Sequence, residues 1–351
     1  MKFYFLIIAL LLSLPTIASA QDQKEEVLKL DTNLVLIDVA VSSKSKSTNA
    51  PVLRPEDFII TEDGVRQKIE SFSTTDVPLN IALLIDTSGS TKGDIDLIRT
   101  AAKRFIADLR PNDRLAVIEF NSEVTVYENL TSDRTKLSQA IDWLQPGTGT
   151  AFYDALQTAI EKVFATTEGR KAIVALTDGV DSDGNAVYEN ILPLLEKSRV
   201  STYFLELNTE EATETGMMKD CDDKDSFYFS TKQLQKYLEE YADSADSSQY
   251  KKHCSIPKLE RMQINRRLYE SARKELRELS NQTGGHVYPC RRLSDLSPAY
   301  DQIAAELRTQ YTLGYYPTNE KRDGKWRSLR IETRRADILT KTKPGYRAPG
   351  E

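Results

Sequence analysis

The sequence predicts an α/β protein, with a doubly wound, mainly parallel sheet and a smaller β-sandwich unit built from strands at both ends of the chain. Three observations support this fold class. Apolar, strand-like runs alternate with helical periodicity between residues 77 and 310, a pattern typical of a parallel sheet covered on both faces. Strand-like alternation also occurs before and after that region. The chain of 351 residues is longer than one hydrophobic core usually holds.

Residues 1–20 have the composition of a secretory signal peptide. A lysine precedes an apolar block at residues 3–14, and small residues at 18–20 offer a cleavage site. The apolar block is too short for a stable membrane span. We therefore expect cleavage near Ala20, a secreted or periplasmic location, and a mature chain without an integral membrane segment.

The two ends of the mature chain are rich in strand-like segments. Residues 21–76 contain candidate strands and an Asp-Gly hairpin turn at 63–64, and residues 311–351 contain further candidate strands. Because an isolated hairpin is marginally stable in water, we expect the two segments to pair into one sandwich. The α/β domain, residues 77–310, would then be inserted between the strands of that sandwich.

The elements of the α/β domain follow from the same patterns. Strands are expected near residues 80–85, 114–120, 123–127, 171–177 and 200–207, and helices near residues 94–109, 133–144, 152–166 and 187–198. The strands joined at residues 121–122 are expected to form an antiparallel edge. After an interruption, helical periodicity returns near residues 263–281 and 295–310, on either side of a short strand at 286–288.

The interruption at about residues 208–262 is acidic and serine-rich, and we interpret it as an insertion with only partial order. An exported protein can hold a disulfide. We expect Cys221 to pair with Cys254, since both lie in this polar segment, which otherwise lacks the means to hold itself together. A bond from either to Cys290, and three free thiols, stay open. The insertion either contributes to partner specificity or is a tolerated surface insertion.

Oxygen-bearing side chains follow two of the expected strands. Residues 86–90, of sequence DTSGS, come directly after an apolar run, and Asp178 follows another. Ligands of doubly wound sheets bind outside the carboxyl ends of strands, so the two aspartates can meet there. A glycine-rich loop at residues 146–151 can bring a threonine hydroxyl to the same place. Oxygen ligands that are mostly neutral suit Mg²⁺, with Mn²⁺ or Ca²⁺ next.

These motifs resemble the metal-ion-dependent adhesion site of von Willebrand factor A domains. That site combines a DxSxS motif, a downstream glycine-threonine loop and a strand-terminal TDG, in this order. The resemblance implies a Rossmann-like sheet and one divalent cation held by five side chains, namely Asp86, Ser88, Ser90, Thr150 and Asp178. Thr150 fits the family pattern better than Thr148, because the family threonine is followed by a small residue and the start of a helix.

Nearly all of the mature chain outside the insertion also resembles the secreted von Willebrand factor A-related proteins of Acidobacteria. The resemblance lies in four segments: PLNIALLIDTSGS at 78–90, QYTLGYYP at 310–317, DGKWRSLRI at 323–331 and GYRAP at 345–349. It implies a bacterial, secreted protein. It implies nothing about the insertion.

The function implied by the resemblance is that of a secreted, metal-dependent protein-binding module of the adhesion type. Since hydroxyl ligands do not neutralise the ion, the metal can complete its coordination with a carboxylate of a partner protein. The net charge of −6 disfavours nucleic acid as a partner. Two alternatives stay open: a structural envelope or assembly protein with a vestigial metal site, and a metal-dependent hydrolase.

We expect no enzymatic activity and predict no catalytic residue. The two histidines, His253 and His286, belong to no motif, whereas a hydrolase needs a nucleophile with a base, or metal-bound water with an acid. Residues 181–185, of sequence DSDGN, resemble part of a calcium loop but lack its remaining ligands. We expect a solvated turn there. The sequence does not determine the oligomeric state.

Overall fold

The computed structural model describes residues 34–43, 52–74, 77–221, 226–241 and 253–350. The expected signal peptide at residues 1–20 lies outside these ranges, as does the start of the N-terminal β unit. Within the described ranges, none of the helices combines the length and the apolar character needed to cross a bilayer.

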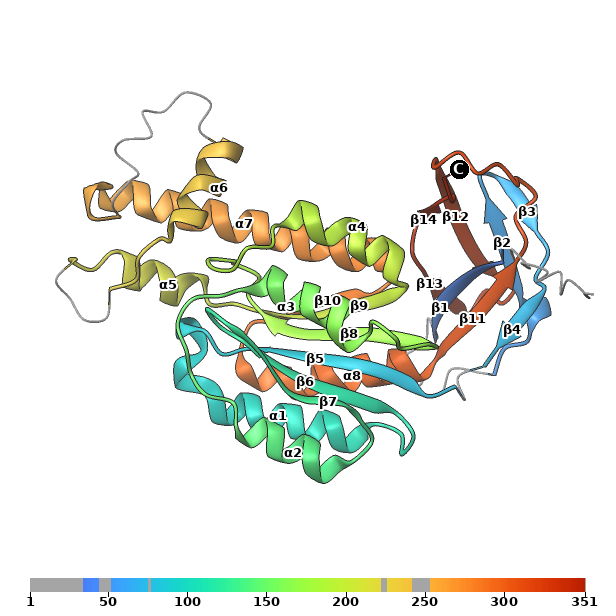
Figure 1. The fold of residues 1–351 in the computed structure, drawn as a ribbon, viewed down its shortest axis with the longest axis horizontal. Helices are drawn as coiled ribbons and strands as arrows, with labels where there is room; N and C mark the ends of the chain where they lie inside the picture. The colour runs from blue at the N-terminus through green and yellow to red at the C-terminus, as the bar shows by residue number, and fades with distance from the viewer. Residues whose placement is uncertain (1–33, 44–51, 75–76, 222–225, 242–252, 351) are drawn as a thin grey trace, which may run out of the picture. The chain divides into compact units, whose positions relative to one another are not determined.

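A six-stranded sheet forms the centre of the α/β domain, in the order β10-β9-β8-β5-β6-β7 (Figure 1). All neighbours pair in parallel except β6 and β7, which form the expected antiparallel edge. The strands are β5 (Leu79–Asp86), β6 (Arg114–Phe120), β7 (Val124–Thr131), β8 (Arg170–Thr177), β9 (Val200–Leu207) and β10 (His286–Cys290). Every residue of β5 is buried, as a strand covered on both faces requires. The predicted fold class is confirmed.

Helices cover both faces of this sheet and form a separate hydrophobic layer on each. One layer contains α1 (Ile95–Asp108), α2 (Arg134–Asp142) and α8 (Leu296–Arg308). The other contains α3 (Phe152–Thr158), α4 (Tyr188–Ser198) and α7 (Lys258–Thr283). Because the helices pack on the flanks, the carboxyl ends of the parallel strands remain available for a site.

Strands from the two ends of the chain pair with each other in the β-sandwich. Its sheets have the orders β13-β1-β11-β4 and β14-β12-β2-β3, so the N-terminal strand β1 lies between the C-terminal strands β11 and β13. The strands are β1 (Val35–Ser43), β2 (Phe58–Glu62), β3 (Val65–Gln67), β4 (Ser71–Ser73), β11 (Gln310–Tyr315), β12 (Trp326–Thr333), β13 (Ile338–Lys341) and β14 (Gly345–Arg347). The expected domain boundaries near residues 77 and 310 stay predictions.

The insertion is more regular than the sequence suggested. It contains α5 (Glu210–Met217) and α6 (Thr231–Tyr241), and α7 begins at Lys258 rather than near residue 263. A small hydrophobic core joins these helices, formed by Met217, Phe229, Leu234, Ile256, Ile264 and Leu268. The view of this segment as one that buries no core of its own is therefore wrong. Its apolar residues are few and far apart in sequence, and they meet only when folded against α7.

The expected disulfide between Cys221 and Cys254 is confirmed, and Cys290 is a buried free thiol. The bond closes a loop with a sequence separation of 33 residues. In the chain-entropy model such a closure stabilises the folded state by roughly 3–4 kcal/mol. We expect reduction, or Cys221→Ser with Cys254→Ser, to lower the melting temperature of the protein. Scanning calorimetry with and without reductant measures this; equal melting curves would contradict it.

Candidate metal centre

Asp86, the last residue of β5, is fully buried, and both of its carboxylate oxygens are held in place. Oδ1 accepts the backbone N–H of Ser88 at 3.0 Å, and Oδ2 accepts the hydroxyl of Thr177 at 2.8 Å. Thr177 ends the neighbouring strand β8, and its hydroxyl oxygen also accepts the backbone N–H of Gly179 at 2.9 Å. The orientation of Asp86 is therefore fixed by both strand ends.

Asp178 follows β8 directly and is also buried. Its Oδ1 accepts the backbone N–H of Val180 at 2.9 Å. Its Oδ2 accepts two hydroxyls, from Thr209 at 2.5 Å and from Tyr269 at 3.2 Å. Thr209 lies at the start of the insertion and Tyr269 in α7, so two elements beyond the sheet hold this carboxylate.

The two carboxylates interact electrostatically. Burial raises the pKa of Asp86 to about 7, and the neighbouring Asp178 adds to the rise, although hydrogen bonds from Ser88 and Thr177 oppose it. A second negative charge in a dry site makes ionisation of Asp86 costly. A cation between the two aspartates would remove that cost, so this pair fits a divalent ion.

The turn after β5 presents the hydroxyls of the DxSxS motif. Ser88 is buried, and the hydroxyl of Thr91 donates to the backbone oxygens of Ser88 at 2.9 Å and Asp86 at 3.2 Å. This double contact closes the turn over the strand end. The backbone of Ser90 lies in the 3-10 turn Gly89–Asp94, and its side chain lies outside the described part of the chain.

The glycine-rich loop brings Thr150 to the same edge. The backbone N–H of Gly147 donates to Thr87 O at 2.7 Å, which ties the loop to the DxSxS turn. Gly149 has a φ of +68°, and a Cβ there would lie 2.0 Å from a carboxylate oxygen of Asp183. Only glycine fits this approach. Thr150 itself is 6% exposed.

The structure thus places the described side chains of the expected site on adjoining strand ends and loops. Sequence reasoning missed the groups that orient the aspartates, namely Thr177, Thr209 and Tyr269. Thr177 directly precedes Asp178, so a hydroxyl next to the second aspartate was a signal in the sequence. Tyr269 had no such signal, because it reaches the site from a distant helix. The described residues hold no group of three His, Cys, Asp or Glu side chains suited to a metal, so any ion here depends on hydroxyl ligands.

Known proteins match this part of the chain. The family model of the von Willebrand factor type A domain matches residues 80–243. The inter-alpha-trypsin inhibitor heavy chain H2 of Mus musculus is 36% identical over 91 residues, which cover 24% of this chain and 10% of that protein. The chain therefore spans about a tenth of the length of this relative.

Two solved structures have a similar fold at low sequence identity. Proximal thread matrix protein 1 from the mussel byssus, described with a zinc-occupied MIDAS motif, is 17% identical with a TM-score of 0.45, over 70% of this chain and 48% of that chain. The protein BatB from Bacteroides thetaiotaomicron is 15% identical with a TM-score of 0.41, over 64% of this chain and 98% of that chain. By the match of its strands, helices and motif-bearing loops to the family model, the chain contains a von Willebrand factor type A domain.

Proposed function

We propose that this protein is a secreted, non-enzymatic binding protein that holds one divalent cation, Mg²⁺ by preference, and uses it to bind an acidic group of a partner protein. The observation that supports this best is the pair of buried carboxylates, Asp86 and Asp178, at neighbouring strand ends. Ser88, Ser90 and Thr150 would complete the ligand set with neutral oxygens, a chemistry suited to Mg²⁺.

When bound, the cation supplies a coordination position for a carboxylate of the partner. The protein controls how strongly it attracts that group through the hydrogen bonds around Asp178. Three donors, the Val180 backbone and the hydroxyls of Thr209 and Tyr269, draw charge from this carboxylate. Asp178 therefore neutralises the ion less than a free carboxylate would.

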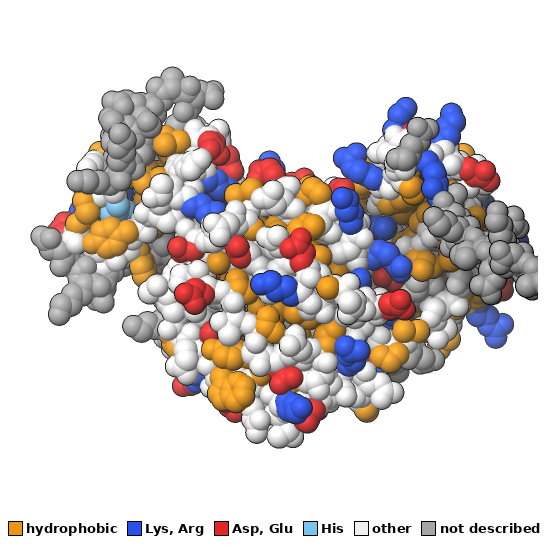
Figure 2. All heavy atoms as spheres, viewed as in Figure 1, with side chains coloured by type: hydrophobic (Ala, Val, Ile, Leu, Met, Phe, Trp, Pro, Cys, Tyr) orange, Lys and Arg blue, Asp and Glu red, His pale blue; other side chains and the backbone are white. Residues whose placement is uncertain are grey.

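A cavity of about 230 Å³ beside the site also supports an acidic partner. Thr91 and Thr209, which hold the DxSxS turn and Asp178, line it together with Arg291 and Arg292. Both arginines are exposed, and no ion pair is recorded for either within the described ranges. On the face drawn in Figure 2, Lys and Arg side chains gather over the C-terminal sandwich strands, whereas both charge signs are mixed over the α/β domain.

The histidines support binding rather than catalysis. His253 Nδ1 accepts the backbone N–H of Phe229 at 3.3 Å inside the insertion, and burial lowers the pKa of His253 to about 4. His286 Nδ1 lies 2.5 Å from Nζ of Lys341, a residue of the sandwich. Each histidine thus has a structural neighbour away from the two aspartates.

The test is capture of partner proteins from an envelope extract of the source, in Mg²⁺ and in EDTA. Wild-type protein and Asp86→Asn serve as matched baits. We expect a partner that wild type retains in Mg²⁺, releases in EDTA and that Asp86→Asn does not retain. A partner held equally by both baits, or in EDTA, would show binding that does not use the metal.

Charge reversal at the cavity rim gives a further prediction. Arg292→Glu is expected to weaken the captured partner about tenfold, because it replaces attraction by repulsion beside the bound acid. Mg²⁺ affinity should change little. Arg114→Glu, at the amino end of β6, makes the same charge change at the opposite edge of the sheet and is the control. Equal losses for both variants would mean a general charge effect instead of a local contact.

A further inference from the structure

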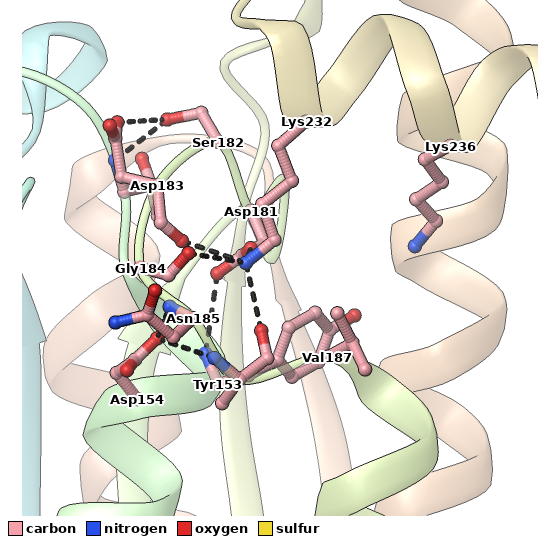
Figure 3. Close-up of polar contacts among 12 residues, drawn as sticks. Tyr153, Asp154, Asp181, Ser182, Asp183, Gly184, Asn185, Val187, Lys232 and Lys236 are labelled. Carbon is pink, nitrogen blue, oxygen red and sulfur yellow. Dashed lines mark hydrogen bonds and ion pairs between the residues drawn. The ribbon is translucent and has the colours of Figure 1, made fainter.

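Residues 181–186 enclose the ammonium group of Lys232, which belongs to helix α6 of the insertion (Figure 3). Its Nζ lies close to four oxygens of this loop: Asp181 Oδ2 at 2.5 Å, Asp183 O at 2.8 Å, Ala186 O at 2.8 Å and Gly184 O at 3.5 Å. One carboxylate and three backbone carbonyls make a typical oxygen cage for a cation. The expected solvated turn is therefore wrong, since the side chain of Asp181 is only 3% exposed.

The cage is shaped by contacts that do not involve Lys232. Asp154, in α3, accepts the backbone N–H groups of Asn185 at 2.9 Å and Ala186 at 3.1 Å. Asp181 Oδ1 accepts the backbone N–H of Tyr153 at 3.3 Å. Gly184 has a φ of +79°, and a Cβ there would lie 1.9 Å from Asp154 Oδ2. These contacts hold the turn and turn its carbonyls toward Lys232.

The same loop holds Thr150, a candidate ligand of the divalent ion. The backbone N–H of Thr150 donates to Ser182 Oγ at 2.8 Å. The backbone oxygen of Thr150 accepts the N–H groups of Ser182 at 2.9 Å and Asp183 at 3.0 Å. Any change in the cage is therefore transmitted through two residues to the backbone on both sides of Thr150.

We propose that residues 181–186 form a binding site for a monovalent, ammonium-like cation, that Lys232 fills this site from the insertion, and that the filled site positions Thr150. Lys232 is thus a positioning residue that couples the insertion to the metal edge. The coupling to Thr150 rests on the proposed function, whereas the cation site stands on its own contacts.

The electrostatics of Asp181 agree with a site that needs a cation. Burial raises the pKa of Asp181 to about 6, and the ammonium of Lys232 acts in the opposite direction. Without a cation, a buried carboxylate and converging carbonyl dipoles would repel one another in a dry environment. An added cation of suitable size should therefore bind where the lysine has been removed.

Lys236, one turn further along α6, provides a matched control. Both lysines lie about equally far from the ring centre of Tyr153, Lys232 at 5.9 Å and Lys236 at 6.0 Å. Lys236 Nζ, however, lies 2.5 Å from the carboxylate of Glu275 and 3.9 Å from that of Glu240. Its recorded partners are side-chain carboxylates and include no backbone carbonyl. Removing Lys236 deletes an ion pair without leaving an oxygen cage.

The experiment is chemical rescue. Melting temperatures of wild type, Lys232→Ala and Lys236→Ala are measured in methylammonium, ammonium, K⁺ and tetramethylammonium chlorides at constant ionic strength. We expect Lys232→Ala to lower the melting temperature by about 5 °C. Methylammonium or ammonium should restore at least half of that loss with saturation, and the bulky tetramethylammonium should not. No saturable recovery, or equal recovery in Lys236→Ala, would overturn the cation site.

Two further measurements complete the test. If Lys232→Ala does not fold in NaCl, its refolding yield in methylammonium chloride replaces the melting shift, and an unchanged yield overturns the site. Mg²⁺ calorimetry should show a roughly fivefold weaker affinity for Lys232→Ala that methylammonium restores. An unchanged Mg²⁺ affinity alongside a clear rescue would overturn the coupling to Thr150. Wild type that binds no Mg²⁺ at all would instead overturn the proposed function and leave the rescue result standing.

Discussion

Asp86→Asn is expected to abolish Mg²⁺ binding and to raise the melting temperature of the metal-free protein at about pH 8. Asn keeps the size of the side chain, and its amide oxygen can still accept a hydrogen bond from Ser88 or Thr177. It removes the charge that the ion requires. In the metal-free protein it also removes a buried negative charge next to Asp178, whose repulsion contributes to the raised pKa of Asp86.

The direction of the pH dependence follows from that pKa. The carboxyl of Asp86 ionises near pH 7 in the folded protein, against an ordinary value of 3.8. Between these values the unfolded chain releases its proton and the folded chain keeps it, so the metal-free protein loses stability as pH rises from about 4 to about 7. The loss amounts to about 4 kcal/mol if each pKa unit contributes 1.36 kcal/mol. Above pH 7 this contribution stays constant.

Melting curves in EDTA at about pH 5 and about pH 8, with and without Mg²⁺, measure these effects. The advantage of Asp86→Asn in EDTA should be larger at the higher pH, and Mg²⁺ should stabilise only wild type. Asp142→Asn, which changes an exposed carboxylate of α2 paired with Lys103, is the control. The assignment fails if Asp86→Asn binds Mg²⁺ as wild type does, or if metal-free wild type is the more stable of the two at about pH 8.

The central sheet could be predicted because its strands announce themselves locally. β5 and β8 are unbroken apolar runs, and each ends in an aspartate next to a hydroxyl or glycine. The helical insertion could not be predicted to the same degree. Its core depends on residues such as Met217, Phe229 and Leu268, which are separated by polar and masking charged residues and show no periodicity until they pack together.

The candidate site divides in the same way. Asp86, Ser88 and Thr150 lie in short motifs, so sequence spacing was enough to propose them. The groups that tune the site come from elsewhere in the chain: Tyr269 reaches Asp178 across 91 residues, and Lys232 reaches the Asp183 carbonyl across 49. Contacts of this kind depend on tertiary packing alone, and a single sequence does not encode them in any local pattern.

Separating the sandwich from the α/β domain should reveal where the stability of the two ends resides. A fragment of residues 77–310 is expected to fold and melt cooperatively, because it keeps the central sheet and the hydrophobic layers on both of its faces. A fragment of residues 21–76 is expected not to fold. Its strand β1 pairs only with C-terminal strands among the described residues, at Ile37 with Leu313 and at Val41 with Thr340.

The reason is the composition of the sandwich core. Ile37, Val39 and Ile60 come from the N-terminal part, whereas Leu313 and Ile331 come from the C-terminal part. Without its partners, the N-terminal part would keep a β2-β3 hairpin, which is marginal in water, and would expose half of a core. Circular dichroism melts of the two fragments measure the outcome. A cooperative transition for 21–76 alone would contradict a shared sandwich, and restored β signal after mixing it with a peptide of residues 311–351 would support the pairing directly.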